Sequence, residues 1–216
     1  MIAAATRPAF SEPPELAAIS IRPLTADDAF AFRALRLEAV KRDGRYFATS
    51  YEAEATRPLA GWRELCAEVN RRCVLGVFDQ GRLVGISALE PWSGDATGAS
   101  VLLRSSYITP AYRGRGLAKP LFATRLQWAA AHDYRRAVLF IREGNAASTG
   151  LHEQFGARPW FTKPMQWADG KTAPAHWYQI DLAEPVAALR RVEPGSPLRP
   201  CDQIEPPSCV PIHSRA

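Results

Sequence analysis

The residues best suited to chemistry in this 216-residue sequence form a short stretch that is both basic and rich in glycine. Arg113 and Arg115 alternate with Gly114 and Gly116, and Lys119 follows three residues later. Glycine lets a ligand come close to the backbone, and a guanidinium forms forked hydrogen bonds to oxyanions. The stretch therefore indicates a site for an anion such as phosphate or pyrophosphate.

The predicted elements on either side show how this turn would be presented. Residues 101–108 are typical of a strand, and Leu117, Leu121, Phe122, Leu126 and Ala129 form one helical stripe. A helix that begins at the turn leaves its first backbone N–H groups without partners and adds partial positive charge there. Strand, turn and helix together favour binding of an anion at the helix N-terminus.

Three phosphate-binding motifs compete for this turn. A Walker-type loop requires Lys-Ser or Lys-Thr, whereas the sequence has Lys119-Pro120, and the dinucleotide fingerprint requires a third glycine at position 119. The remaining pattern, Arg-x-x-Gly-x-Ala from Arg113 to Ala118, resembles the acetyl-CoA motif of the GNAT superfamily of N-acetyltransferases. Taken alone, the stretch is also compatible with an ordinary glycine-rich connection between a strand and a helix.

A second block strengthens the resemblance. Residues 145–157 read Asn-Ala-Ala, then Leu151-His152, two polar residues, Phe155 and Gly156-Ala157. The corresponding block of the family has an Asn, a small residue, Leu-Tyr, two polar residues, an apolar residue and Gly-Phe. The resemblance extends from about residue 19 to residue 182, is strongest over residues 106–157 and is weak in the N-terminal helices.

The order of predicted elements is strand, two helices, three strands, helix, strand, helix and two strands. It predicts an α/β, GNAT-like fold: a mixed, mostly antiparallel central sheet with helices on both faces and a parallel β-α-β cofactor unit. The first helix is expected from Thr25 to about Val40 with Phe30, Ala34, Leu37 and Val40 on its buried face, and residues 41–56 are expected to form a polar loop. Residues 1–17 are expected to be a flexible N-terminus, residues 18–183 the GNAT domain and residues 184–216 a Pro-rich, partly disordered tail.

The resemblance implies where acetyl-CoA would bind. Its pantetheine arm would enter between the strands that end at Ile108 and Ile141, which would splay apart, and its pyrophosphate would lie on the turn. The implied cofactor-binding residues are Ser106, Tyr107, Ile108, Arg113, Gly114, Arg115, Gly116, Leu117, Ala118, Lys119 and Asn145. For Asn145, capping of the following helix is an equally good interpretation, because Asn is a favoured N-cap.

The resemblance also implies direct acyl transfer to an amine, which needs a base, an oxyanion donor and an acid. The family often uses a Tyr as the acid, and His152 stands at that position here. Glu52 and Glu54 are the candidate bases, and they would favour a cationic acceptor; the alternatives are that both are solvated acids and that water relays the proton. We predict an N-acetyltransferase acting on a primary amine of a small molecule or protein, with a non-catalytic acyl-CoA-binding domain as the alternative.

Composition limits the other possibilities. The formal net charge is +5, which suits a polyanionic cofactor as well as a nucleic acid, and the arginines are scattered in pairs, so we do not expect a nucleic-acid partner. No stretch has the roughly 18 to 20 consecutive apolar residues of a membrane helix. We expect no signal peptide, reduced cysteines, no bound metal and a cytoplasmic protein that is a monomer or a homodimer.

Overall fold

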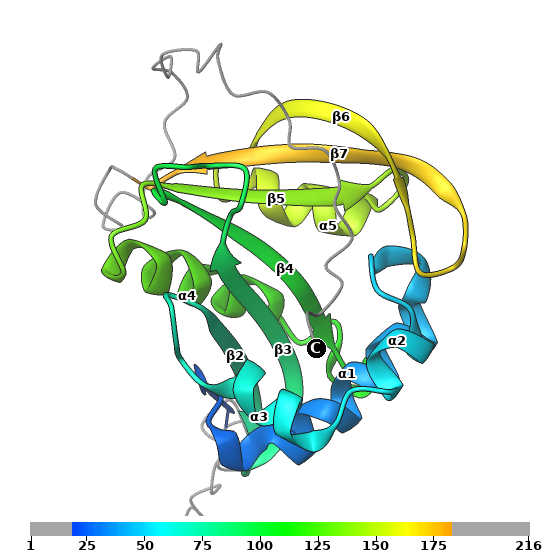
Figure 1. Ribbon diagram of the computed structural model, residues 1–216. Coiled ribbons are helices and arrows are strands. Elements are labelled where there is room, and N and C mark those ends of the chain that lie inside the picture. Colours follow the sequence, from blue (N-terminus) through cyan, green and yellow to red (C-terminus); the bar gives the residue numbers. More distant parts are fainter. Residues whose placement is uncertain (1–18, 183–216) are drawn as a thin grey trace, which may run out of the picture.

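The computed structural model describes residues 19–182, which form a seven-stranded sheet with helices on both of its faces (Figure 1). The strands are β1 (Ile19–Pro23), β2 (Cys73–Asp79), β3 (Arg82–Pro91), β4 (Ser100–Ile108), β5 (Arg136–Arg142), β6 (Arg158–Gln166) and β7 (Thr172–Asp181). The helices are α1 (Ala29–Asp43), α2 (Tyr51–Ala55), α3 (Leu59–Cys66), α4 (Ala118–Ala131) and α5 (Ala146–Glu153), with 3-10 turns η1 (Ala26–Asp28), η2 (Gly44–Tyr46) and η3 (Pro110–Tyr112). The strand order is β1-β2-β3-β4-β5-β7-β6.

The predicted fold class is confirmed. Strands β4 and β5 are parallel, and each of the other neighbouring pairs in the sheet is antiparallel. The helix between β4 and β5 is α4, so these three elements form the expected parallel β-α-β unit. The model also confirms the hairpin of β2 and β3, whose connection contains Gly81 at a φ of 82°.

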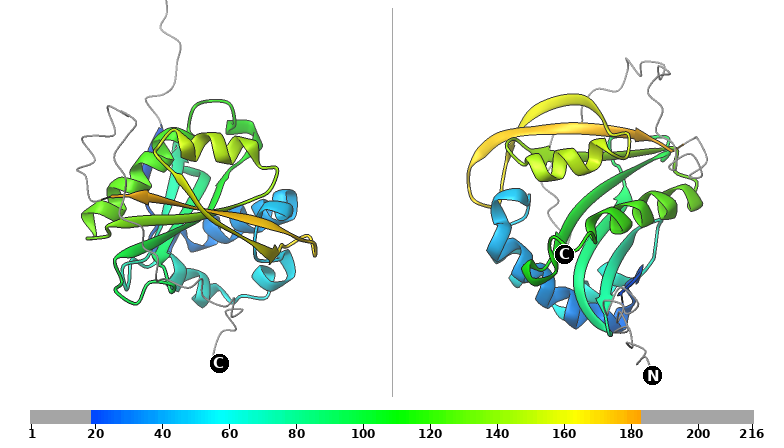
Figure 2. Two further views of the ribbon diagram at one scale, coloured as in Figure 1. Left: turned by 90° about the horizontal axis from the view of Figure 1, so that it is seen from above. Right: turned by 180° about the vertical axis from the view of Figure 1, so that it is seen from behind.

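The helices are divided between the two faces of the sheet. Viewed from above, α4 and α5 lie on one face and α1, α2 and α3 on the other (Figure 2). Apolar side chains of α4 such as Phe122 and Leu126 pack on Leu75 and Val77 of β2. On the opposite face Phe32, Leu35 and Trp62 pack on Val74, Phe78 and Ile86. The two cores hold the sheet rigidly between its helical layers.

The sheet opens between its two central strands. The β4–β5 pairing runs only from Ser100 and Arg136 to Leu103 and Leu139. Beyond that point the strands separate, and Figure 1 shows them meeting at one end and diverging towards the other. The predicted splaying of the strands that end at Ile108 and Ile141 is therefore confirmed. It leaves one edge of β4, from residue 104 to residue 108, without a partner strand.

A β-bulge lies in the open part of β4. Ile86 pairs with Tyr107 and Ala88 with Arg104, so Ser105 and Ser106 together face one residue of β3. Ser105 has a φ of 60°, which is uncommon for a residue other than glycine. A bulge bends its strand and turns its side chains to new directions. Here it does so beside the gap between the two halves of the sheet.

The expected buried face of the first helix is only partly right: Val40 is buried and Leu37 is half-buried, but the first two residues of that face are exposed. Phe30 is 73% exposed and Ala34 is also exposed, whereas the buried stripe contains Phe32, Leu35 and Ala39. The two stripes share Val40, but the centre of the buried one is turned by roughly 130° around the helix axis from the expected one. Only the second stripe includes a charged residue within the buried face, Arg36, and this disrupts the apolar periodicity that the sequence presents.

The expected polar loop of residues 41–56 is also wrong. Helix α1 continues to Asp43, η2 follows, and residues 51–55 form α2. Ser50 caps α2, because its hydroxyl accepts a hydrogen bond from the Ala53 N–H. A serine at the N-cap followed by two glutamates in the first turn is a signal for the start of a helix. The polar composition of the segment led to the prediction of a loop instead.

Candidate functional site

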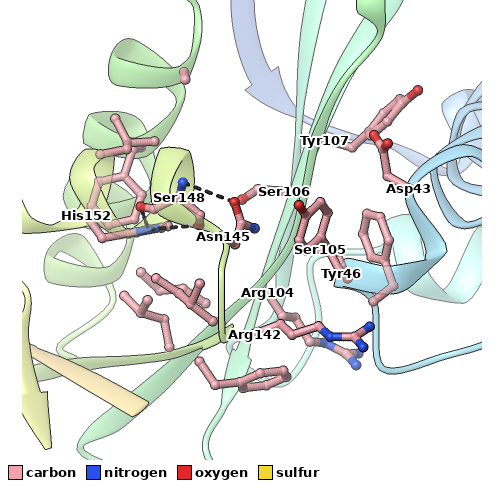
Figure 3. A pocket seen from close by; sticks show the side chains of 18 of the residues that line it. Asp43, Tyr46, Arg104, Ser105, Ser106, Tyr107, Arg142, Asn145, Ser148 and His152 are labelled. Atoms are coloured by element: carbon pink, nitrogen blue, oxygen red, sulfur yellow. Dashed lines mark hydrogen bonds between the residues drawn. The ribbon is translucent and has the colours of Figure 1, made fainter. Parts of the chain in front are cut away.

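A cavity of about 520 Å³ occupies the gap between the two halves of the sheet. Strands β4 and β5 form two of its walls, α4 and α5 close one side, and the end of α1 with the segment after it closes the other. Figure 3 shows residues from these elements around one space: His152 on α5, Asn145 just before α5, Ser105 and Ser106 on β4, and Tyr46 after α1. The cavity therefore passes through the sheet and joins its two faces.

The basic turn lies at the α4 end of this cavity. Gly114 and Gly116 have φ values of 74° and 79°, which require glycine, and a Cβ at either position would have open space around it. Helix α4 begins at Ala118, so the first-turn N–H groups are free to bind an anion. The positive φ values bring the backbone to the helix start without side chains in the way.

The predicted cofactor residues fall into three groups. Six of them line the cavity: Ser106, Tyr107, Ile108, Arg113, Ala118 and Asn145. Four lie exposed in the turn at its edge: Gly114, Arg115, Gly116 and Lys119. Leu117 is 4% exposed and its side chain belongs to the apolar core, so only its backbone is available at the turn.

Arg113 and Asn145 are partly engaged by the protein itself. Arg113 donates from Nε to the Ile108 carbonyl oxygen at 2.8 Å and forms an ion pair with Asp43. Asn145 is the N-cap of α5, and its side-chain oxygen accepts a hydrogen bond from the Ser148 N–H at 3.3 Å. The capping interpretation of Asn145 thus has a direct contact, and its side chain also borders the cavity.

His152 lies in the cavity wall and is 7% exposed. Its Nδ1 is 2.6 Å from the Ser148 carbonyl oxygen, which can only accept, so the proton of the neutral ring is assigned to Nδ1. Burial, together with the nearby charge of Arg125, lowers the pKa of His152 to about 4. At neutral pH the ring is uncharged, and its Nε2 is a hydrogen-bond acceptor. The role of His152 as an acid stays a prediction, and this tautomer does not favour it.

The two candidate bases lie outside the cavity lining. Glu52 is exposed on α2. Glu54 is 5% exposed and accepts two hydrogen bonds from Arg36 at 2.8 and 3.0 Å. The structure therefore brings neither glutamate to the cavity, and their roles as bases stay predictions without geometric support.

Sequence reasoning missed the arginines on the side of the cavity near α1. Arg104 pairs with Glu90 at 2.7 Å, and Arg142 pairs with Asp169 at 2.7 Å. Figure 3 shows Arg104 and Arg142 projecting from the two separated strands below Tyr46. Strand position was a usable signal for Arg142, which directly follows an apolar run at the end of β5, whereas Arg104 lies within β4 and becomes notable only because the β4–β5 pairing stops before it.

Arg125 was also missed, and it is the most deeply buried charged side chain of the cavity wall, at 2% exposed. It projects from α4 to β4 and donates from Nη1 to the Ser106 hydroxyl at 2.8 Å. Burial lowers its pKa to about 9. Its position on the apolar stripe of α4, four residues after Leu121, offered no signal of a functional role.

The sequence matches the family model described as the acetyltransferase (GNAT) family over residues 37–157. The chain belongs to this family. The matched residues include the end of α1, β4, the basic turn, α4 and α5, which are elements around the cavity. The resemblance of the Arg113–Ala118 motif to the acetyl-CoA motif is thus confirmed at the level of the family.

Comparison with individual proteins gives a narrower match in sequence and a broad match in fold. Phosphinothricin N-acetyltransferase of Streptomyces coelicolor is 32% identical over 76 residues, which are 35% of this chain and 44% of that protein. The matched part is thus less than half of the length of this curated relative.

Two solved structures share the fold. A putative acetyltransferase from Salmonella typhimurium, solved with its cofactor acetyl-CoA, gives a TM-score of 0.64 at 22% identity, covering 76% of this chain and 94% of that chain. Ribosomal-protein-alanine N-acetyltransferase from Brucella melitensis also gives a TM-score of 0.64, at 24% identity. That match covers 75% of this chain and 99% of the other chain. The GNAT fold is therefore established for the part of the chain around the cavity.

Two further observations concern residues 19–182 only. None of their helices combines the length and apolar character needed to cross a membrane. Within the same residues, no three His, Cys, Asp or Glu side chains come together in a way that could hold a metal ion. Cys66 and Cys73 are free thiols in the core, whereas Cys201 and Cys209 lie outside the described residues.

Proposed function

We propose that this GNAT protein is an acetyl-CoA-dependent N-acetyltransferase that moves an acetyl group directly to a primary amine. One observation carries the proposal: the unpaired edge of β4 leads from the basic turn into a cavity that is open to both faces of the sheet. A donor can enter from the α4 side and an acceptor from the α1 side. The two would then meet at the bulge of β4 without a covalent enzyme intermediate.

The residues present suit acetyl-CoA. Over Ser106, Tyr107 and Ile108, the edge of β4 that faces away from β3 has no partner strand among the described residues, so its backbone offers hydrogen bonds to the amide groups of a pantetheine arm, as in the addition of a strand. The N–H groups of the turn and the N-terminus of α4 suit a pyrophosphate. Arg115 and Lys119 are exposed beside the turn and add positive charge. The Salmonella relative, which has the same fold, was solved with acetyl-CoA.

When bound, acetyl-CoA supplies an activated acetyl group on a thioester. Transfer forms a bond between the amine nitrogen and the carbonyl carbon and breaks the carbon–sulfur bond, whose electron pair leaves on sulfur. Backbone N–H groups at the bulge of β4 can stabilise the carbonyl oxygen. The amine releases one proton, and the thiolate takes up one proton from a donor or from water.

We infer that the acceptor is a small amine that also carries an acidic group. The cavity wall on the α1 side combines a guanidinium and a carboxylate in the Arg104–Glu90 pair, with Arg142 near by. This arrangement suits a molecule with both charges, whereas the sequence led us to expect a cationic acceptor. The name of the Streptomyces relative makes phosphinothricin the first acceptor to test.

The remaining expectations are proposals of the same kind. We propose a cytoplasmic protein that acts as a monomer or homodimer, with no nucleic-acid partner. We place the GNAT domain at residues 18–183. The proposed flexible N-terminus, 1–17, and the Pro-rich tail, 184–216, lie outside the described residues.

The proposal is tested by following release of the CoA thiol while amines are screened in the presence of acetyl-CoA. We expect turnover with phosphinothricin or another amine that carries an acidic group, and a product heavier by one acetyl group in mass spectrometry. Tight binding of acetyl-CoA without turnover on any amine would instead indicate the non-catalytic acyl-CoA-binding alternative.

A further inference from the structure

The guanidinium of Arg125 has no carboxylate partner among residues 19–182. The other four arginines of the cavity wall each have one: Arg36 with Glu54, Arg104 with Glu90, Arg113 with Asp43 and Arg142 with Asp169. Arg125 instead contacts the Ser106 hydroxyl and, at 3.3 Å, the Ala88 carbonyl oxygen, and its Nε has no hydrogen-bond partner. A buried cation without a counter-charge is costly, so its presence needs an explanation.

Local structure explains only part of the burial of Arg125. Arg125 reaches the β-bulge from α4, because Ala88 and Ser106 lie on the two strands at the point where their register shifts. Ser106 also exchanges a hydrogen bond with Ser87 at 2.7 Å. Both contacts are to neutral oxygens, and hydrogen bonds to neutral oxygens do not require a charged donor. The charge itself is therefore the feature that requires a role.

The position of Arg125 excludes one role. It lies seven residues after the start of α4 at Ala118, which places it about 10 Å along the helix axis from the turn. The pyrophosphate expected at the turn is too far away to be its counter-ion. Arg125 lies instead beneath the bulge, beside His152, at the level where the unpaired edge of β4 begins.

His152 does not supply a positive charge at this place. Its ring is neutral at pH 7, and the proton on Nδ1 is directed to the Ser148 carbonyl oxygen. The ring also packs edge-on against Phe122, with 4.6 Å between ring centroids. Arg125 is thus the one full positive charge, among the described residues, in the wall between α4, α5 and the bulge.

We propose that Arg125 stabilises the negative charge that develops on the departing sulfur of CoA during acetyl transfer. This inference rests on the proposed function. The carbon–sulfur bond breaks, its electron pair stays on sulfur, and the adjacent guanidinium lowers the energy of the thiolate until it takes up a proton. Nothing is oxidised or reduced, and the products are the N-acetylated amine and the CoA thiol. The substrate anion is the missing counter-charge, and it is present only while the reaction proceeds.

The test measures the pKa of the thiol group of CoA while CoA is bound to the protein. The titration is monitored by the ultraviolet absorbance of the thiolate, after subtraction of the absorbance of the unliganded protein. We expect this pKa to lie about one unit or more below that of free CoA in the same buffer. In Arg125→Met and in Arg125→Gln it should return to the value of free CoA. The same variants should lose about 10²-fold in kcat and keep their Kd for acetyl-CoA.

Two variants separate the charge from its structural effects. Arg125→Gln keeps a hydrogen-bond donor for the bulge, so a bound thiol pKa that stays low in this variant would overturn the proposal. Arg63→Met removes an exposed arginine of α3 and should leave the bound thiol pKa unchanged. An unshifted thiol pKa in the wild-type complex would also overturn the proposal while leaving the transferase function intact. Failure of CoA to bind would contradict the proposed function itself.

Discussion

The neutral, buried His152 predicts a specific sensitivity of the fold to acid. Its pKa falls from an ordinary 6.5 to about 4 in the folded protein, because the ring is buried and Arg125 repels its charged form. Between these two pH values the unfolded chain binds a proton that the folded chain does not. The free energy of unfolding therefore decreases as pH falls from about 6.5 to about 4, and below that range this contribution stays constant.

The size of the effect follows from the two pKa values. A difference of one pKa unit corresponds to 1.36 kcal/mol, so the interval from 6.5 to about 4 is worth about 3 kcal/mol. His152→Gln removes the titrating group. Carboxylates titrate in the same range, but they are present in both proteins, so the difference between wild type and variant isolates the histidine.

The assay is urea unfolding of wild type and His152→Gln at a series of pH values from about 7 to about 4, analysed by midpoint at constant slope. As pH falls over this interval, the free energy of unfolding of the variant should rise by about 3 kcal/mol relative to that of the wild type, whatever the stability of the variant at pH 7. Two curves of stability against pH that run parallel would refute the account of a buried, neutral His152. They would also remove the basis for assigning the positive charge beside the bulge to Arg125 alone.

Other predictions follow from the remaining ionisable side chains. Arg36→Met leaves the buried Glu54 carboxylate with only Arg57, at 3.8 Å, and should lower the free energy of unfolding by about 3–5 kcal/mol. The double variant Arg36→Met with Glu54→Leu should lower that free energy far less. Equal losses in the single and the double variant would contradict a stabilising ion pair. Cys66 and Cys73 are buried, and burial raises the pKa of each thiol to about 12. In a variant with Cys201 and Cys209 replaced by serine, a thiol reagent should therefore modify neither cysteine until the protein unfolds. Rapid modification of the native protein would show that the core opens. Glu52 is exposed outside the cavity, so Glu52→Gln should leave the pH–rate profile unshifted, and loss of the acidic limb of that profile would restore Glu52 as a base.

The parts of the fold that could be predicted from the sequence are those encoded locally. The turn from Arg113 to Ala118, the apolar stripe of α4 and the continuous apolar run of β5 each carry their signal within a few residues. Two strands joined by one helix then have to be parallel and right-handed in their crossover. The separation of these strands followed from the family resemblance, and the short β4–β5 ladder confirms it.

The parts that could not be predicted depend on contacts between distant residues. Glu54 was offered as a base because it lies in a stretch expected to be a polar loop beside the acceptor, but its partner Arg36 lies 18 residues earlier and pairs with it in the core. The same buried arginine concealed the true inner face of α1. Long-range pairs of this kind leave no periodic pattern in a single sequence.

Arg125 illustrates the same limit within the site. In the sequence it is an arginine on the apolar stripe of a predicted helix, and the charged end of an arginine usually reaches solvent. Its burial becomes apparent only when α4 is packed on the sheet and the bulge brings Ser106 within 2.8 Å. The bulge could not be predicted from the sequence either, because the residue with a φ of 60° is Ser105 and not a glycine.

Calorimetric titration of acetyl-CoA into the full-length protein tests the central claim most directly, with Gly116→Trp as the matched variant. Gly116 has a φ of 79° in the turn, and a tryptophan there would strain the backbone and cover the N-terminus of α4. The account predicts micromolar binding of one acetyl-CoA by the wild type and loss of that binding in a variant that still folds. No binding by the wild-type protein, or equal binding by both, would contradict an acetyl-CoA site at this turn.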